Sequence, residues 1–406
     1  MTEAGSHLAP GNDQGRRLLV TTLEDGEMST PLPDFRLEVF FSEWEFTARY
    51  HLTASDAETL TVSEVLALAT DEERAAFAEL PLGYTPTWGS ESLREAIAST
   101  YETLGPEHVL TFAGAEEGMF WALQELLGPG DHGVVTVPNY ESMESLMVHT
   151  GATIDGLVLR PEDGWRIDLS EFERLLHPET RVVAVNFPNN PTGAVPDRDT
   201  FIQLSALCHE RGIRLFSDEV YRGIELDPNL TLPQAADLAP RAISLNVMSK
   251  AYGLPGLRIG WLASKDRALL ERLERRKHYT SICSSAPSEH LATIALHNGD
   301  QILSRNRAIV SENLPLFDAF FDARAEQFAW ERPQGGCVCF PRLLTGETTD
   351  SFCRRLVKTA GVLLLPADIY ASDLGAVAND RFRVGVGRRN PAPALEAFAA
   401  FMDSEL

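Results

Sequence analysis

A lysine at position 250 has the surroundings that a reactive amine needs. It follows the apolar run 243–248, which is typical of a buried strand, and Arg258 comes eight residues later. An amine at the mouth of a buried strand loses hydration and becomes nucleophilic, and a nearby guanidinium can hold a phosphate or carboxylate by paired hydrogen bonds. Lys250 and Arg258 are therefore candidates for covalent catalysis beside an anion site.

Three other polar clusters lie at similar places. Asp218 ends the apolar run 215–218, with a phenol close behind, and Asn190 lies in a constrained turn with two prolines and a glycine after the run 182–187. The turn 112–117 opens an apolar helical pattern, and free backbone N–H groups at such a helix start can bind a phosphate. These clusters indicate a site that holds a phosphorylated, charged ligand.

The elements that must position these residues alternate between helical patterns and short apolar runs. The runs are 134–137, 154–159, 182–187, 215–218, 243–248 and 259–263. Strands that alternate with helices predict an α/β fold with a mostly parallel sheet, covered on both faces. Ligands bind at the carboxyl ends of such strands, where the polar clusters lie.

The chain predicts two packed domains. Residues 1–34 have the composition of a flexible arm, and residues 35–80 are expected to fold back as the N-terminal part of a small domain. Residues 81–285 form the predicted large domain, and 286–406 complete the small α+β domain with a long helical stretch and short strands.

Taken together, three segments resemble the class I and II aminotransferases of fold type I. They are Asn-Asn-Pro-Thr-Gly (189–193), Asp-Glu-Val-Tyr (218–221) and Ser-Lys-Ala-Tyr-Gly-Leu-Pro-Gly-Leu-Arg-Ile-Gly (249–260), and the match in order and spacing covers about 84–383. The resemblance implies the aspartate aminotransferase-like fold, an enzyme with pyridoxal 5′-phosphate as its cofactor, an amino acid substrate and a homodimer with shared active sites.

The resemblance also implies a role for each matching residue. Lys250 would hold the cofactor as a Schiff base and move a proton between the substrate Cα and the cofactor. Asp218 would pair with the protonated pyridine nitrogen, and Asn190 and Tyr221 would bind the phenolic oxygen of the ring. Arg383 would grip the substrate carboxylate, with Asn190 beside it. The remaining cofactor contacts would come from backbone groups of Gly114, Ala115 and Glu116, from the side chains of Ser249 and Arg258, from Tyr140 stacked on the ring, and from Tyr84 of the neighbouring subunit.

The chain departs from that pattern in two places. Val247 replaces a Ser or Thr that most relatives use to bind the phosphate, and the segment 52–58 lacks the usual Gly-x-Pro turn near the substrate. Residues 37–46 and 61–68 resemble instead the capreomycidine synthase subgroup, which cyclises a hydroxylated arginine. Glu43 or Glu45 could then bind a guanidinium, with an exposed helical glutamate as the alternative.

Three functions stay open at this stage. The first is transamination between an amino acid and a 2-oxo acid. The second is an elimination, replacement or cyclisation on a specialised amino acid of natural product biosynthesis, which begins with the same α-deprotonation. The third is a ligand-responsive regulator, which the short N-terminal arm and the acidic composition disfavour.

Composition narrows the partners and the compartment. The net charge of −24 disfavours nucleic acid and anionic membranes, and the sequence shows neither a membrane span nor a signal peptide, so we expect a cytoplasmic protein. The odd number of cysteines and the spacing of Cys337 and Cys339 suit no metal motif, so no metal is expected. The string Gly-x-Gly-x-x-Gly at 128–133 precedes a strand, which predicts a helix-to-strand turn and not a dinucleotide site.

Overall fold

The computed structural model of the protein describes residues 31–404, so most of the expected arm 1–34 lies outside the described residues. Its central element is a seven-stranded sheet with the order β2-β8-β7-β6-β5-β3-β4. Only β8 runs antiparallel to its neighbours, so the predicted mostly parallel sheet is confirmed. The strands are β2 (Val109–Phe112), β3 (His132–Val137), β4 (Thr153–Val158), β5 (Thr180–Asn186), β6 (Arg214–Asp218), β7 (Ile243–Val247) and β8 (Gly260–Ala263).

All six apolar runs are strands of this sheet, and the string 128–133 is the predicted turn between α5 (Ala115–Leu126) and β3. The edge strand β2 was not predicted from the sequence. Its four residues are all buried, but a run this short gives no clear periodic signal.

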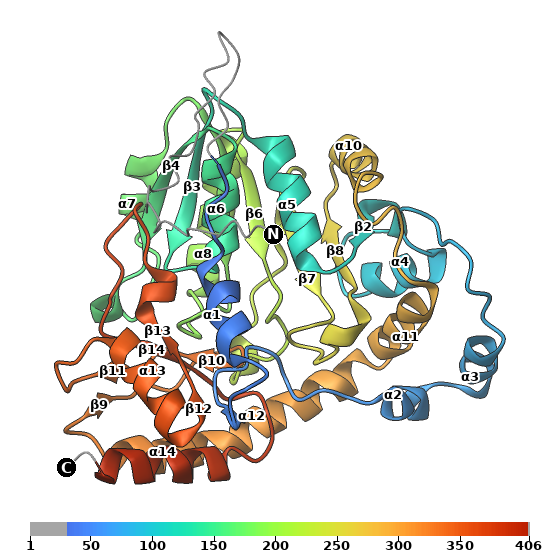
Figure 1. Ribbon diagram of the computed structural model, residues 1–406. Coiled ribbons are helices and arrows are strands. Elements are labelled where there is room, and N and C mark those ends of the chain that lie inside the picture. Colours follow the sequence, from blue (N-terminus) through green and yellow to red (C-terminus); the bar gives the residue numbers. More distant parts are fainter. Residues whose placement is uncertain (1–30, 405–406) are drawn as a thin grey trace, which may run out of the picture.

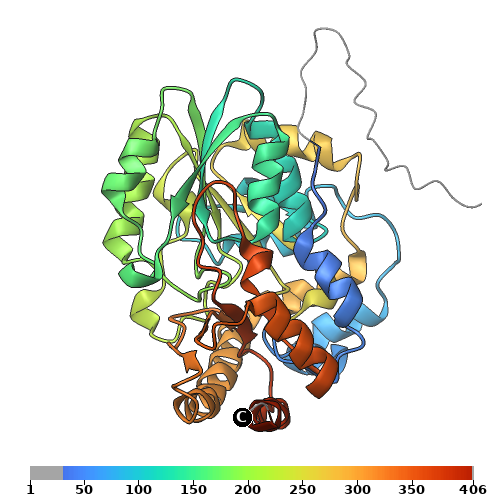
Figure 2. The ribbon, with the colours of Figure 1, turned by 60° about the vertical axis from the view of Figure 1, so that its left-hand side comes forward.

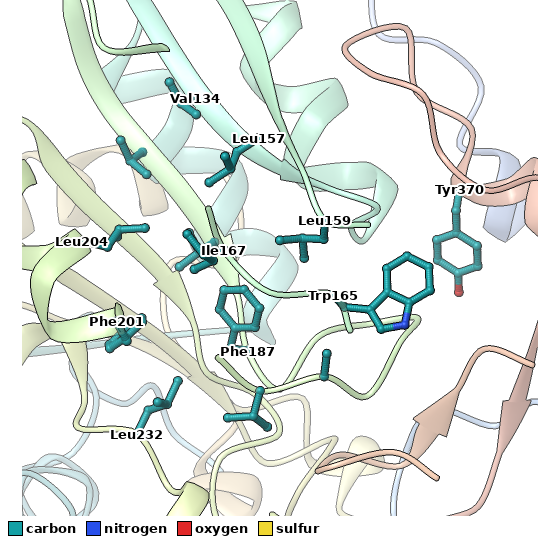
Figure 3. Close-up of a cluster of buried hydrophobic side chains, with 14 of the residues drawn as sticks. Val134, Leu157, Leu159, Trp165, Ile167, Phe187, Phe201, Leu204, Leu232 and Tyr370 are labelled. Carbon is teal, nitrogen blue, oxygen red and sulfur yellow. The ribbon is translucent and has the colours of Figure 1, made fainter. Parts of the chain in front are cut away.

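Helices cover both faces of the sheet, as Figure 1 shows. Consecutive residues of β3 point to opposite faces: Val134 packs in the cluster that includes α8, and Val135 in the cluster that includes α5. Figure 3 shows the first cluster, which extends from the sheet to Tyr370 in the C-terminal part. The helices on the sheet include α4 (Glu91–Ala98), α6 (Glu141–His149), α7 (Leu169–Leu175), α8 (Arg198–Glu210), α9 (Ala235–Leu238) and α10 (Arg267–Lys277).

The C-terminal part is a smaller α+β unit. Its phenylalanine-rich core lies between α12 (Gly299–Asp322), α13 (Thr349–Ala360), α14 (Ala392–Ser404) and short strands. These strands are β9 (Phe328–Ala329), β10 (Val338–Cys339), β11 (Arg342–Leu343), β12 (Val362–Leu363), β13 (Leu365–Pro366) and β14 (Phe382–Gly385). The long helical stretch followed by short strands agrees with the pattern in the sequence.

The segment before the sheet contacts both units. β1 (Tyr50–His51) pairs in parallel with β12, and α1 (Arg36–Trp44) lies beside α13 in Figures 1 and 2. In contrast, α2 (Val62–Leu68) and α3 (Asp71–Ala78) pack against α11 (Ala286–His297). The division at residues 80 and 285 therefore stays a prediction. Within residues 31–404, no helix combines the length and apolar character that crossing a membrane requires.

Candidate active site

A cavity of about 620 Å³ lies where the carboxyl ends of the parallel strands face the small unit. It has two walls. The sheet wall consists of the lining residues that follow the strands or open α5 and α6, namely Ala115, Glu116, Met119, Tyr140, Asn186, Asn190, Asp218, Val220, Tyr221, Val247, Ser249, Lys250, Pro255 and Arg258. The outer wall consists of Phe35, Leu37, Glu38, Phe41, Glu45, His51, Ala54, Ser55, Asp56, Arg383 and Arg388.

The structure brings together most of the residues that the sequence singled out. Ten of them line the cavity, namely Ala115, Glu116, Tyr140, Asn190, Asp218, Tyr221, Ser249, Lys250, Arg258 and Arg383. Gly114 lies directly behind the cavity as the residue that precedes α5. Tyr84 does not reach the cavity of its own chain, because it lies on the surface with 92% of its area exposed.

Lys250 lies in the turn that follows β7, and its amine points into the cavity. Its Nζ donates a hydrogen bond to Ser55 Oγ at 2.8 Å, which links the two walls. Burial lowers the pKa of Lys250, and Arg383 lowers it further, whereas Asp56 and Asp218 act in the opposite direction. A larger fraction of the amine is therefore neutral near pH 7 than in water, as a nucleophile or a base requires.

Asp218 ends β6 with 4% of its area exposed. Its Oδ1 accepts a hydrogen bond from the Val220 N–H at 3.1 Å. Burial raises the pKa of Asp218 to about 7, because the charged form loses hydration. A cationic ring nitrogen placed against this carboxylate would restore its charged form, so the residue fits the pyridinium of the implied cofactor.

Asn190 and Tyr221 flank this carboxylate. The Asn190 side-chain oxygen accepts hydrogen bonds from Tyr370 OH at 3.2 Å and from Arg383 Nη1 at 3.3 Å. The two N–H groups of its amide point elsewhere and can serve a ligand. Tyr221 OH donates to the carbonyl of Ser55 at 2.8 Å, and burial raises its pKa well above the usual range, so it acts as a neutral donor.

The start of α5 forms an anion cradle. Gly114 has a φ of 95°, and a Cβ at this position would lie 2.3 Å from Arg258 Nη2, so only glycine allows the arginine to approach. The first N–H groups of α5 have no carbonyl partner within the helix. Ser249 Oγ is buried and has no hydrogen-bond partner among residues 31–404.

A phosphate in the cradle would satisfy the Ser249 hydroxyl, the helix N–H groups and Arg258 together. Val247 lines the cavity, but its side chain has no hydroxyl group that could bind the phosphate. The Glu116 side chain accepts a hydrogen bond from Ser142, so only its backbone can serve the phosphate. Tyr140, at the entrance to α6, packs edge-on against Phe35 at 5.4 Å and stands over the cavity.

Arg383 lies on β14 with 1% of its area exposed. Its Nε and Nη2 donate to the side chain and the carbonyl of Thr53 at 3.2 and 2.8 Å, and its Nη1 also donates to Tyr370 OH at 2.9 Å. With the bond to Asn190, four of its five N–H groups are engaged in a fixed frame. The arginine faces the cavity and has one N–H left, so a carboxylate can bind it with little rearrangement.

The outer wall also holds Asp56, Arg388 and Glu38, which the sequence did not reveal, and Glu45, which it named as a candidate. Asp56, 8% exposed, forms an ion pair with Arg388, whose Nε donates to Oδ1 at 3.2 Å and whose Nη2 donates to Oδ2 at 3.0 Å. Glu45 and Glu38 line the cavity from α1, and Glu38 acts with burial to raise the pKa of Glu45. The one available signal was the unusual segment 52–58, which contains both Ser55 and Asp56. Glu43, the other glutamate considered, pairs with Arg354 at 3.1 Å outside the cavity.

Comparisons with known proteins agree with this geometry. A family model for aminotransferases of class I and II matches residues 51–397. Capreomycidine synthase of Streptomyces vinaceus is 32% identical over 92% of this chain and 94% of its own length. The arginine–pyruvate transaminase of Pseudomonas aeruginosa is 28% identical over 75% of this chain and 77% of its own length.

Two solved structures share the fold over their whole length. A PLP-dependent aminotransferase from Streptococcus suis has a TM-score of 0.85 and 29% identity, covering 92% of this chain and 99% of its own. The PLP-dependent cyclase OrfR has a TM-score of 0.84 and 23% identity, covering 95% of this chain and 100% of its own, which supports the fold alone. The chain therefore belongs to the class I and II aminotransferase family and is an enzyme whose cofactor is pyridoxal 5′-phosphate.

Proposed function

We propose that this enzyme binds pyridoxal 5′-phosphate covalently at Lys250 and removes the α-proton of an amino acid. The observation that carries the proposal is the convergence of Lys250, Asp218 and Arg383 on one cavity. When bound, the cofactor supplies an electron-poor ring that takes up the electron pair left at Cα. The residues of the chain do the rest.

The sheet wall holds and tunes the cofactor. The backbone of Gly114, Ala115 and Glu116, with Ser249 and Arg258, binds the phosphate group. Asp218 would keep the pyridine nitrogen protonated, the amide of Asn190 would donate to the phenolic oxygen, and the Tyr221 O–H would turn from the Ser55 carbonyl to do the same. Tyr140, which lines the cavity, would pack against the ring. All of these residues except Gly114 line the cavity, and the buried Ser249 hydroxyl is free to bind the phosphate.

With the substrate in the cavity, Lys250 would serve as the base. Its lowered pKa supplies the neutral amine that accepts the α-proton. Ser55, 2.8 Å from Nζ, holds the displaced amine inside the cavity. Arg383, fixed by Thr53, Tyr370 and Asn190, binds the substrate carboxylate and so orients the Cα–H bond toward the lysine.

The outer wall favours a substrate with a cationic side chain. Asp56 is neutralised by Arg388, which leaves Glu38 and Glu45 as acidic lining residues. Mutual repulsion and burial raise the pKa of Glu45, and a guanidinium between the two carboxylates would relieve both effects. The names of two relatives, capreomycidine synthase and arginine–pyruvate transaminase, agree with an arginine-type amino acid.

We propose transamination with a 2-oxo acid as the first reaction, in line with the family. The second candidate is elimination and cyclisation of a hydroxylated arginine-type amino acid in natural product biosynthesis. It is favoured by Ser55 in a segment without the usual Gly-x-Pro turn, and by the match to capreomycidine synthase along almost the whole chain.

We also infer a cytoplasmic homodimer. Segment 82–87 lies along segment 278–284, joined by a bond from Thr85 Oγ1 to the Ser284 carbonyl at 2.9 Å. Large apolar side chains are exposed on both segments, namely Leu82, Tyr84, Tyr279 and Ile282. A second copy of the chain would cover this surface, and the family resemblance implies that Tyr84 would then contact the partner's cofactor phosphate. The five free cysteines suit a reducing compartment.

The test is mass spectrometry of cofactor and product after the enzyme meets arginine, hydroxylated arginines, aspartate and tyrosine. Conversion of the cofactor to pyridoxamine phosphate with release of a 2-oxo acid supports transamination. A product that keeps its α-nitrogen, with the cofactor unchanged, supports cyclisation. Absence of any reaction or any α-proton exchange with solvent across the panel would contradict the proposal.

A further inference from the structure

Three polar side chains meet near the amino-terminal ends of β3, β4 and β5, at the end of the sheet opposite the active site. His132 is the first residue of β3, Asp155 is the third residue of β4, and His177 lies in the turn between α7 and β5. One ligand atom from each residue lies within 4.8 Å of the other two. The cavity lies at the carboxyl ends of the same strands, so this cluster takes no part in the proposed reaction.

The distances suit a small cation. His132 Nε2 lies 3.2 Å from Asp155 Oδ2, and His177 Nε2 lies 4.0 Å from the same oxygen. Ligand atoms about 2.0 to 2.2 Å from a tetrahedral Zn²⁺ are separated by roughly 3.3 to 3.6 Å. The His177 side chain is exposed and can turn to bring its nitrogen closer to the other two ligand atoms, which lie within 4.8 Å of it.

The other nitrogen of His132 is also held. His132 Nδ1 lies 2.8 Å from the hydroxyl of Thr180, a residue with 3% of its area exposed. If Thr180 accepts this hydrogen bond, the lone pair of Nε2 points at Asp155, which is the arrangement by which outer partners orient a ligating histidine.

The backbone fixes all three residues in place. His132 pairs with Thr153 of β4 and with Thr180 of β5, and the ladder to β5 shifts register directly after it. The His177 N–H donates to Thr180 Oγ1 at 2.7 Å. The two imidazole rings are stacked with their centroids 4.3 Å apart, so the exposed His177 ring would turn out of the stack to direct its nitrogen at a shared cation.

We propose that His132, Asp155 and His177 form a binding site for a late first-row divalent cation such as Zn²⁺, with water completing its coordination. Two imidazoles and one carboxylate suit such an ion better than Mg²⁺ or Ca²⁺, which prefer oxygen ligands. The ion would fasten the start of β3 to β4 and β5. The three ligands are far apart in the sequence and form no motif, which explains why no metal was expected there.

The test is a Zn²⁺ titration of the chelator-treated enzyme, with its cofactor in place, against a chromophoric competitor. His177→Ala and Asp155→Asn alter exposed or half-exposed side chains, so both variants should fold, and His209→Ala removes an exposed histidine elsewhere. We expect one Zn²⁺ per chain in the wild type and in His209→Ala, with binding roughly 100-fold weaker in the other two variants. Zn²⁺ should also raise the unfolding temperature of the wild type but not of His177→Ala. Failure of the wild type to bind Zn²⁺, or equal affinity in the wild type and His177→Ala, would overturn the site without touching the proposed catalysis.

Discussion

The two walls of the cavity are built in different ways. The sheet wall takes its residues from the ends of neighbouring strands and the starts of the helices that follow, and its groups suit a phosphate, a pyridinium and an amine. The outer wall combines α1, the segment 51–56 and β14, which the chain brings together across some 330 residues, as the Asp56–Arg388 pair shows. The sheet wall therefore defines the chemistry, and the outer wall defines the substrate.

Replacement of Lys250 should have the largest effect. Lys250→Ala removes both the covalent attachment point and the base, so we expect turnover to fall by about 10³-fold or more. The visible absorption of the lysine-bound cofactor should disappear as well. Lys265→Ala, whose Nζ bonds the Asp237 carbonyl outside the cavity, is the matched control. Wild-type turnover and absorption in Lys250→Ala would show that Lys250 is neither the attachment point of the cofactor nor the base.

Asp218→Asn should follow, since it removes the partner of the pyridine nitrogen but keeps the shape of the site. We expect turnover to fall roughly 100- to 1000-fold with the cofactor still bound. Glu219→Gln is the control, because Glu219 is equally buried but binds the Ala235 N–H and Ser244 away from the cavity. Equal losses in both variants would indicate a structural effect only.

The same residue predicts a pH dependence of the cofactor-free protein. The pKa of Asp218 is raised to about 7, so the folded state binds its proton more tightly than the unfolded state. The stability from this group is present below pH 4 and is lost as the pH rises through 7, by up to roughly 4 kcal/mol. Asp218→Asn should therefore be more stable than wild type at pH 8, relative to pH 5, in urea unfolding of the cofactor-free proteins. A constant difference between the two pH values would contradict this.

On the outer wall, Arg383→Lys should act on substrate binding. The lysine keeps the charge but loses the planar guanidinium and the bonds that fix it to Thr53, Tyr370 and Asn190, so KM should rise roughly 30-fold, equivalent to ~2 kcal/mol, with an unchanged cofactor spectrum. Arg381→Lys, on the same stretch of chain but facing away from the cavity, should leave KM unchanged. Loss of the cofactor in Arg383→Lys would show that Arg383 binds the cofactor and does not belong to the substrate-binding outer wall.

Glu45→Gln should have the smallest effect and the most selective one. Removal of one partly exposed carboxylate should raise KM for an arginine-type substrate roughly 5-fold and leave neutral amino acids unaffected. Glu43→Gln, which only breaks the surface pair with Arg354, should change neither. Equal changes for cationic and neutral substrates would show that Glu45 does not read the side-chain charge.

The contrast between the walls also explains what the sequence could predict. Lys250, Asp218 and Asn190 could be predicted from the sequence because each lies at or just after the end of a buried apolar run. Parallel strands bring such positions together at the carboxyl end of the sheet. Ser55 and Asp56 were not predicted, because their positions depend on the pairing of β1 with β12 about 310 residues away. Glu45 was named only beside Glu43, because the packing of α1 decides which of the two lines the cavity. Local patterns carry no information about either. Only the missing Gly-x-Pro turn marked the segment as unusual.

The attachment point of the cofactor is the central claim, and the chain makes it testable because its other lysines are few: Lys265, Lys277 and Lys358. Lys277 is the real competitor, since it is buried and its pKa is lowered to about 8, but its Nζ donates to the Thr87 carbonyl at 2.6 Å outside the cavity. The most direct measurement is borohydride reduction of the purified enzyme followed by peptide mass mapping. We predict a single phosphopyridoxyl group on Lys250. A label on Lys277, on another lysine or on none would contradict the account.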